Sequence, residues 1–225
     1  MHSLLDIKKM NKIKYLSIIL IILGMILLLY SPISNYINQK NQNEIIKDYG
    51  QKIKSTQSRL IEEELKKAIK YNQNLFEENE NDVPYSELLN INKDGVMGYI
   101  EIPKINLKLV IYHGTNEETL KKGVGHLEKS SLPIGGKSSY TVLTGHSGLK
   151  QAKIFTRLEE LKNGDRFYIN VLGLKLEYKV FSIEKVLPTE IEGLKIQEDE
   201  DLAALVTCTP IGINTHRLIV KGKRV

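Results

Sequence analysis

The residues with the clearest chemical potential lie near the end of the chain, in the stretch ALVTCTPIGINTHRLIV at 204–220. It contains Cys208, the only cysteine of the protein, at the end of an apolar run. Pro210 and Gly212 then favour a turn, and a second apolar run contains Arg217. A hairpin centred just after Gly212 would place Cys208 opposite Arg217, with both side chains on one face. A longer loop is the alternative, and a register shift of one residue would turn one of the two away.

This pair suits nucleophilic chemistry at a carbonyl carbon. A fixed positive charge beside a cysteine favours the thiolate, which is the reactive form. The donors of a guanidinium can also hold the negative charge that develops on a carbonyl oxygen under attack. A histidine from a third strand would complete the set as the proton donor to a leaving amine. Together the three groups predict acyl transfer through a thioester. The structural alternatives are a buried, unreactive cysteine and a surface arginine in an ion pair.

His146 is the candidate for the third group among the five histidines. It lies in LTGHSG, where an apolar strand ends and glycine opens the chain, and catalytic residues often occupy such strand ends. A loop histidine bonded to the backbone is the alternative. His2 precedes the long apolar run near the N-terminus and is set aside, and structural roles are expected for His113, His126 and His216.

Short runs rich in β-branched residues carry these groups, and turn signals separate the runs. From about residue 95 the chain shows seven or more such runs with short helical segments between them, at 116–128 and 153–164. This pattern predicts a mainly β domain that is closed or nearly closed into a barrel. The expected strands are GYIEIPKI (98–105), LKLVIYHG (107–114), SYTVLTGH (139–146), DRFYINVL (165–172), LKLEYKVFSIEKV (174–186), LAALVTCT (202–209) and HRLIVKGKRV (216–225).

The beginning of the chain has a different composition. No charged residue occurs from Tyr15 to Gln39, and the front half of this stretch is almost entirely Leu, Ile and Met. Such a run can cross a hydrocarbon layer about 30 Å thick, and the lysines before it predict that this end stays in the cytoplasm. A cleaved signal peptide is the alternative, but its apolar region is usually only about 7–15 residues long. We therefore expect a basic cytoplasmic tail at 1–14 and a membrane anchor at 15–37, with the rest outside the cell.

A polar segment at 38–94 separates the anchor from the expected catalytic domain at 95–225. Apolar residues at a helical period and pairs such as Glu62 with Lys66 predict either a helical stalk or a helix lying on the domain. An Asn-rich loop broken by Pro84 follows. The net charge of +5 is too mild to predict nucleic-acid binding. The sequence contains no cluster of metal ligands, so neither a metal nor a cofactor is expected.

At these residues the sequence resembles the sortase family. Sortases are membrane-anchored cysteine transpeptidases of Gram-positive bacteria, built on an eight-stranded β-barrel. The family pattern Thr-Leu-x-Thr-Cys corresponds to ALVTC at 204–208, where only the first position differs. The arginine nine positions after the cysteine and the TGH about sixty residues upstream also agree. The resemblance covers about residues 95–225, and it implies a closed eight-stranded barrel preceded by a transmembrane helix.

Three stretches, at 95–115, 123–136 and 207–224, are similar to the class C, or pilin-polymerising, branch of the family. Two features of this sequence differ from the pattern of class C enzymes. Many class C enzymes have His-Arg-Gly where this chain has His146-Ser147-Gly148. They also often carry a C-terminal membrane helix, whereas the last expected strand here extends to Val225, where the sequence ends.

A third departure concerns the lid loop, which in class C enzymes covers the active site with an Asp-Pro-aromatic motif. The nearest match is Asp82-Val83-Pro84-Tyr85, which has an inserted residue, and Phe76 is another candidate plug. Asp82, Tyr85 and Phe76 are therefore the candidate lid residues, and the insertion puts autoinhibition by a lid in doubt.

The resemblance implies a role for each candidate in the site. Cys208 attacks the Thr–Gly bond of a Leu-Pro-x-Thr-Gly type of sorting motif and forms a thioester with the substrate threonine. Arg217 orients the substrate and stabilises the oxyanion, and Thr207 supports the substrate next to Cys208. His146 protonates the leaving amine and then deprotonates the incoming amine, which in class C would be a lysine of the next pilin subunit.

The expected partners are surface proteins that carry a sorting motif, chiefly pilin subunits, and the lipid bilayer through the N-terminal helix. The protein is expected at the cell membrane, with a single span. One alternative is a sortase that attaches surface proteins to peptidoglycan. An alternative of another class is a non-catalytic, membrane-tethered barrel that binds ligands. Such a module would not need all three of Cys208, His146 and Arg217.

Overall fold

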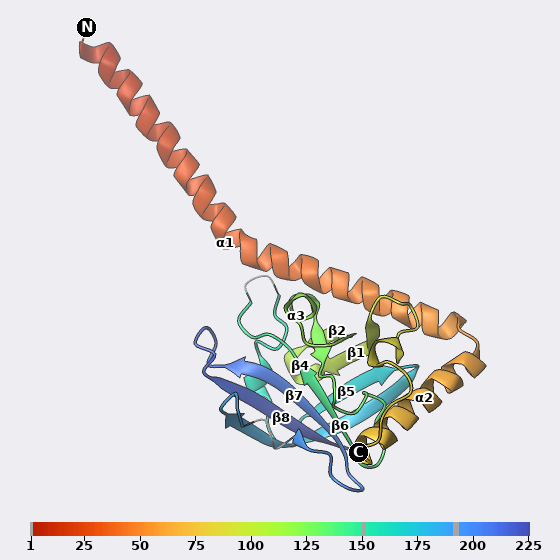
Figure 1. The fold of residues 1–225 in the computed structure, drawn as a ribbon. Helices are drawn as coiled ribbons and strands as arrows, with labels where there is room; N and C mark the ends of the chain where they lie inside the picture. Colours follow the sequence, from red (N-terminus) through yellow and green to blue (C-terminus); the bar gives the residue numbers. More distant parts are fainter. Residues whose placement is uncertain (1, 150–151, 191–193) are drawn as a thin grey trace.

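The computed structural model describes residues 2–149, 152–190 and 194–225, and of residues 2–13 only the helical backbone. Its centre is a closed barrel, so the predicted mainly β architecture is confirmed (Figure 1). The order around the barrel is β1-β2-β3-β4-β7-β8-β6-β5. The strands are β1 Val96–Ile102, β2 Leu107–His113, β3 Val124–His126, β4 Ser139–Thr144, β5 Arg166–Val171, β6 Leu174–Val186, β7 Asp201–Thr209 and β8 His216–Arg224.

The helical elements differ from the predicted ones in two places. The segment 116–128 was expected to be helical, but only α3, Glu117–Lys122, is a helix, and β3 follows it. In the segment 153–164 the structure has only the short 3-10 helix η3, Leu158–Glu160. Two further 3-10 helices are η1 Tyr85–Glu87 and η2 Pro103–Ile105. The two long helices, α1 His2–Ser55 and α2 Ser58–Phe76, precede the barrel.

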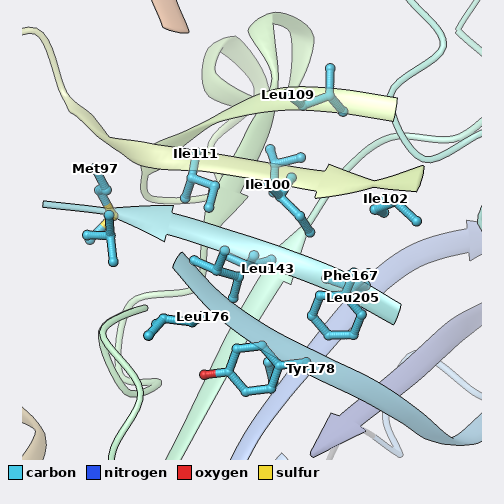
Figure 2. Close-up of a cluster of buried hydrophobic side chains, with 14 of the residues drawn as sticks. Met97, Ile100, Ile102, Leu109, Ile111, Leu143, Phe167, Leu176, Tyr178 and Leu205 are labelled. Carbon is cyan, nitrogen blue, oxygen red and sulfur yellow. The ribbon is translucent and has the colours of Figure 1, made fainter. Parts of the chain in front are cut away.

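The barrel interior is filled by apolar side chains at alternate positions of the strands, as the strand period requires (Figure 2). The rings of Phe167 and Tyr178 stack there, with centroids 5.4 Å apart. Gly222 of β8 lies under this pair, and a Cβ on it would come within 2.5 Å of Phe167 Cε1. The residue at this point of β8 must therefore be glycine, because any side chain would displace the ring pair.

A second apolar cluster lies on the other face of strands β4, β7 and β8. Its position follows from alternation, because Ala203 and Leu205 of β7 belong to the interior cluster and their neighbours do not. The members of this outer cluster are Tyr140, Val142, Leu202, Ala204, Val206 and Ile219, packed against Leu127, Val186, Leu194 and Ile196. Residues from the β6–β7 connection thus cover the outer face of these three strands.

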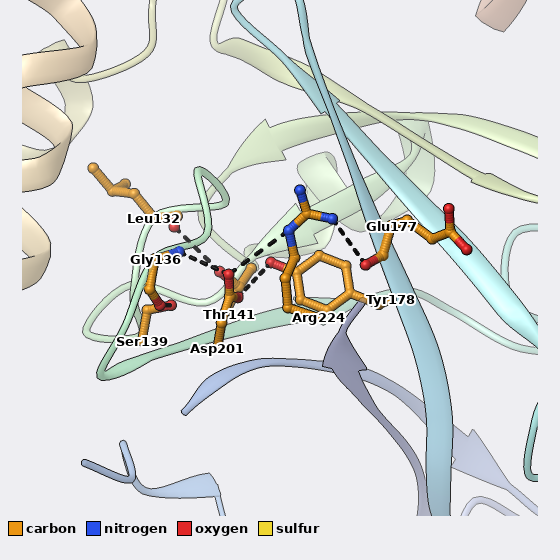
Figure 3. A network of polar contacts seen from close by, with 8 residues as sticks. All are labelled: Leu132, Gly136, Ser139, Thr141, Glu177, Tyr178, Asp201 and Arg224. Atoms are coloured by element: carbon orange, nitrogen blue, oxygen red, sulfur yellow. Dashed lines mark hydrogen bonds and ion pairs between the residues drawn. The ribbon is translucent and has the colours of Figure 1, made fainter. Parts of the chain in front are cut away.

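A polar network fixes the end of the barrel where β7 begins and β8 ends (Figure 3). The Asp201 carboxylate accepts hydrogen bonds from the Gly136 N–H at 2.8 Å and the Tyr178 hydroxyl at 2.9 Å. Arg224 lies 3.8 Å from the same carboxylate and donates to the Glu177 carbonyl at 3.0 Å. Burial raises the pKa of Asp201 above its usual range.

The part of helix α1 that follows its apolar run packs against the barrel. Gln42 accepts from the Val110 N–H at 2.8 Å and donates to the Lys122 carbonyl at 2.6 Å. The Tyr49 hydroxyl donates to the Met97 carbonyl at 3.0 Å and accepts from the Leu172 N–H at 2.9 Å, and burial raises its pKa to about 12. Of the two predicted arrangements, the structure therefore has a helix that lies on the domain.

Helix α2 is tied to the barrel by side chains that bond to the backbone. Asn72 accepts from the Leu132 N–H at 2.7 Å and donates to the carbonyl of the same residue at 3.2 Å. The buried carboxylate of Glu64 accepts from the Leu89 N–H at 2.6 Å. Each of these side chains bonds to a backbone N–H group, and such a group needs a partner when it is buried. The bonds therefore fix α2 against the backbone at Leu132 and Leu89.

Candidate active site

The β7–β8 hairpin has the register that the sequence predicted. Cys208 of β7 is the Cα partner of Arg217 of β8. Directly opposed residues have Cβ atoms about 4.5–5.5 Å apart and point to the same face. Strand β8 is also paired with β6 on its other side, where Val186 is the partner of Arg217. The arginine therefore extends from a strand that is held on both edges.

Alternation along the strands shows which face this is. Val206 and Ile219, each two residues from Cys208 and Arg217 respectively, belong to the outer apolar cluster. Because side chains two apart on a strand share a face, Cys208 and Arg217 continue that outer face beyond the cluster. Cys208 is half-buried and not in a disulfide. The thiol thus lies at the end of an apolar surface that runs along β4 and β7.

His146 reaches the same place from β4. Strands β4 and β7 run parallel, with Thr144 paired to Val206, and the contacts continue beyond this pair. The Gly145 N–H donates to the Val206 carbonyl at 3.0 Å, and the Ser147 hydroxyl donates to the Cys208 carbonyl at 2.5 Å. His146 lies between these two contacts, at the level of Cys208. The structure therefore brings the three predicted catalytic residues to one end of one sheet face.

Gly145 has a steric reason to precede the histidine. A Cβ at this position would lie 2.8 Å from both Ile154 Cγ2 and Phe155 Cδ2. The Phe155 N–H also donates to the His146 carbonyl at 2.9 Å. The buried segment at 154–155 therefore packs against the backbone that carries His146 and fixes its course.

The charges around the site are sparse. The His146 side chain is 25% exposed, and its Nε2 lies 3.8 Å from the Glu117 carboxylate of α3. Arg217 donates to the carbonyls of Asn214 at 3.3 Å and of His216 at 3.2 Å. Within the described part of the chain, no carboxylate forms an ion pair with Arg217. The described residues thus give no support to the alternative that Arg217 is a surface arginine in an ion pair. Its guanidinium has further N–H donors available for a substrate.

Thr207 has a different contact from the one expected for it. Its hydroxyl donates to the Gly145 carbonyl at 2.6 Å, and its side chain is buried on the face opposite to Cys208. The hydroxyl hydrogen is therefore already used to hold the chain next to His146. A direct role in holding substrate stays a prediction.

The candidate lid residues contact other parts of the molecule. Asp82 forms an ion pair with Lys70 at 2.5 Å, and Phe76 lines a cavity of about 490 Å³ between α2 and the loop at 134–138. The Tyr85 hydroxyl accepts from the Gly114 N–H and bonds to His126 Nδ1 at 2.8 Å. None of these contacts involves the three residues of the site, and a lid function stays a prediction.

The other histidines of the barrel have structural partners. His126 is fully buried between Tyr85 and the Ser131 carbonyl, and burial lowers its pKa to about 4. His113 bonds through both ring nitrogens to the carbonyls of Gly95 and Leu88. His216 contacts the Thr215 hydroxyl at 3.0 Å. The structural roles expected for these three agree with the contacts.

Sequence reasoning missed two contacts at the site. Ser147 follows His146 directly, so its polar side chain was a visible signal, but its partner was not. Glu117 lies in a short helix nearly thirty residues earlier in the chain, and no local pattern connects it to His146. The arrangement places a thiol, an imidazole and a guanidinium at one end of one sheet face, and acyl transfer through a thioester uses side chains of these three types.

Comparison with known proteins agrees with this chemistry. A family model described as the Sortase domain matches residues 100–225. The crystal structure of Clostridium perfringens sortase C with the C-terminal cell wall sorting motif is similar, with a TM-score of 0.74 and 48% identity over 81% of this chain and 98% of that chain. Sortase C1 of GBS Pilus Island 1 has a TM-score of 0.77 and 39% identity, over 82% of this chain and 92% of that one.

Among curated proteins, sortase D of Bacillus subtilis is 33% identical over 131 residues, which is 57% of this chain and 63% of that protein. The chain spans about three-fifths of the length of that protein and of two sortase A proteins that it also matches.

Proposed function

The chain belongs to the sortase family, and from this premise we propose that it is a membrane-anchored, extracellular cysteine transpeptidase. The observation that carries the proposal is the pairing of Cys208 with Arg217, with His146 beside them on the same sheet face. A ligand-binding module would have no use for this set. The site residues of the proposed enzyme are Cys208, His146 and Arg217.

In the first half of the proposed reaction, the Cys208 thiol gives its proton to His146, and the Cys208 sulfur attacks the carbonyl carbon of the threonine in a Leu-Pro-x-Thr-Gly type of motif. The carbonyl oxygen gains negative charge, and the Arg217 guanidinium donates hydrogen bonds to it. The bond between this carbon and the glycine nitrogen then breaks, and His146 gives its proton to the leaving amine. The product is a thioester between Cys208 and the threonine, with a neutral imidazole beside it.

In the second half, an amine replaces the departed glycine. The neutral His146 takes a proton from the incoming nitrogen, which attacks the thioester carbon and forms an amide bond. The carbon–sulfur bond breaks, the sulfur takes the proton from His146, and the Cys208 thiol is restored. Because Cys208 is only half-buried, both amines can reach the carbon from the solvent side.

The acyl acceptor that we propose is a lysine side chain of a pilin subunit. The supporting observation is the similarity to sortase C structures, one of them from a pilus island, at 39–48% identity over about four-fifths of the chain. The alternative acceptor is a cell-wall amine, as for a sortase that attaches proteins to peptidoglycan.

We also propose that α1 anchors the enzyme in the membrane. By length and composition, its part Lys14–Ser55 includes a segment apolar enough to cross a bilayer, and none of the most apolar window is buried against the barrel. The division that follows is a tail at 1–14, an anchor at 15–37, the packed helices and loop at 38–94, and the catalytic barrel at 95–225.

The test uses a chain that starts at residue 38 and a peptide that carries the sorting motif. Mass spectrometry should detect an acyl adduct on Cys208 whose mass corresponds to the peptide up to its threonine. The Cys208→Ala variant should form no adduct while unfolding at the same temperature. If the wild type neither forms the adduct nor cleaves the peptide, the enzymatic proposal is wrong.

The acceptor is tested in the same assay with two amines. A peptide with an internal pilin-type lysine and a cell-wall-type amino peptide compete for the acyl-enzyme at equal concentrations. We expect the lysine peptide to form most of the amide product. A dominant cell-wall product would instead support the peptidoglycan alternative.

A further inference from the structure

We propose that the tip of the β7–β8 hairpin, residues 210–215, is a second membrane contact. It would hold the active-site end of the barrel against the lipid bilayer. The inference rests on the proposed membrane anchor. The partner is the interfacial layer of the bilayer, where phospholipid headgroups meet the first part of the acyl chains.

The pairing of the elements shows that the anchor and the hairpin tip extend from the same end of the barrel. Gln42 of α1 bonds to Val110 of β2, whereas Gln39 bonds to the carbonyl of Lys108 at 3.3 Å. Moving toward the anchor along α1 therefore means moving toward the beginning of β2. The span at 15–37 continues beyond that end.

The same end carries the site, as the strand directions show. Strand β2 is parallel to β3, β3 is antiparallel to β4, and β4 is parallel to β7. The beginning of β2 therefore lies at the end of the barrel where β4 and β7 terminate, which is the end with His146 and Cys208. In Figure 1 the arrow of β7 accordingly points to the side from which the N-terminal half of α1 departs.

The distance between the span and the barrel is short. The uncharged run of α1 ends at Gln39, and Gln39 is already in contact with Lys108 of β2. An α-helix rises only about 1.5 Å per residue, so no spacer separates the end of the span from the barrel. The interfacial layer on each side of the hydrocarbon is roughly 5–7 Å thick. This end of the barrel therefore lies at the level of the headgroups.

The composition of the hairpin tip suits that environment. It contains no charged residue, and the side chains of Ile211 and Ile213 are 46% and 69% exposed. Apolar side chains on an uncharged loop favour the boundary between headgroups and acyl chains. Ile213 is the more exposed of the two and should enter that layer.

The contact would set the height of the active site. In the sequence, Cys208 lies two residues before the first residue of the hairpin tip and five residues before Ile213. At about 3.3 Å per residue, the thiol then lies roughly 10–15 Å from the buried end of the tip. Two attachments, the span and the tip, would prevent the barrel from rotating about α1. The thiol would thus stay close to substrates that are themselves held at the membrane surface.

The chain has no tryptophan, so one introduced tryptophan is the only one present. The full chain is reconstituted into phosphatidylcholine–phosphatidylglycerol vesicles with brominated acyl chains, which quench indole fluorescence on contact. The test variant is Ile213→Trp. The matched control is Leu174→Trp, which changes a 38% exposed apolar residue at the start of β6. Because Val186 of β6 pairs with Arg217, the start of β6 lies at the opposite end of the barrel.

We expect the fluorescence of the Ile213→Trp variant to be quenched at least threefold more than that of the Leu174→Trp variant, with a shift of its emission to shorter wavelength. A Leu23→Trp variant, in the span, reports on the anchor itself. If Leu23→Trp is not quenched, the proposed anchor fails. If Leu23→Trp is quenched but Ile213→Trp behaves like Leu174→Trp, the anchor stands and the second contact is refuted. If added sorting-motif peptide prevents quenching of the Ile213→Trp variant, the membrane contact is also refuted. The hairpin tip would then be a peptide-binding element.

Discussion

At the residue scale, the feature that distinguishes the proposed site is one arginine, which lies opposite the thiol on a strand that is paired on both sides. Arg217 pairs with Cys208 on one side and with Val186 on the other, and its guanidinium also donates to the carbonyls of Asn214 in the turn and of His216 at the start of β8. In the proposed reaction the guanidinium must donate hydrogen bonds to these backbone carbonyls and to a substrate oxygen, and its planar set of donors allows both. A lysine offers a point charge on a flexible stem and cannot reproduce that geometry.

We therefore expect Arg217→Lys to lower kcat/KM for motif cleavage by about 10²–10³-fold, the usual effect of removing an oxyanion donor. The rate of acyl-enzyme formation, followed by rapid quench and mass spectrometry, measures it. The matched control is Arg224→Lys, which makes the same change at the other end of β8 and should keep nearly full activity. Equal losses in the two variants would argue against a specific role for Arg217.

Two tyrosines, the buried Tyr140 and the half-buried Tyr85, differ in the hydrogen bonds of their hydroxyl groups. Within the described part of the chain, the Tyr140 hydroxyl is buried without a hydrogen-bond partner. The Tyr85 hydroxyl joins the Gly114 N–H to His126. We expect Tyr140→Phe to leave the free energy of unfolding unchanged or slightly higher, and Tyr85→Phe to lower it by about 1–3 kcal/mol. Urea unfolding of both variants measures the difference, and a larger loss for Tyr140→Phe would contradict it.

At the scale of elements, the hairpin was predictable and the helix boundaries were not. The turn residues between Cys208 and Arg217 are local, so the register followed from the sequence. The parallel pairing of β4 with β7 joins segments about sixty residues apart, and only the packed barrel decides it. The short strand β3 was assigned to a helix because its three residues, Val124, Gly125 and His126, have no alternation of their own. Its place between β2 and β4 is a tertiary effect.

The connection after β4 positions His146, and a substitution at Gly145 tests this role. We expect Gly145→Ala to lower kcat for motif cleavage by at least tenfold, because its Cβ would displace Phe155 or the histidine backbone. Gly50→Ala in α1 is the control, since a Cβ there meets nothing within 4 Å, and it should raise stability by about 0.5–1 kcal/mol. Steady-state kinetics with thermal unfolding of each variant separates the effects. Full activity of Gly145→Ala would show that the connection can shift freely.

At the scale of the whole molecule, the barrel and the helix before it form one folding unit. Ile46 and Tyr49 of α1 pack on Val96 and Val110, and the composition of this segment alone did not distinguish a free stalk from such a packed helix. A chain that starts at residue 38 keeps these contacts, and one that starts at residue 57 loses them. Burying two such side chains contributes about 3–6 kcal/mol. The shorter chain should therefore melt roughly 6–20 °C lower, as calorimetry can measure. Equal melting temperatures would show that the helix is a spacer only.

The stability of the whole barrel should also decrease as the pH is lowered, because His126 is buried as a neutral ring. Its pKa is about 4 in the folded protein, against about 6.5 when unfolded, since burial disfavours the charged form. Below pH 6.5 the unfolded chain therefore binds a proton that the folded chain does not, and stability falls until the pH reaches about 4. The loss should approach about 3 kcal/mol.

Asp201 acts in the opposite direction, because burial raises its pKa in the folded state, so a single pH series mixes the two groups. The measurement is therefore made on two chains: urea midpoints at pH 7, 5.5 and 4.5 for the wild type and for His126→Asn. The variant should be less stable at pH 7 but lose less on acidification. Parallel pH curves for the two chains would show that another group controls the acid sensitivity of the barrel.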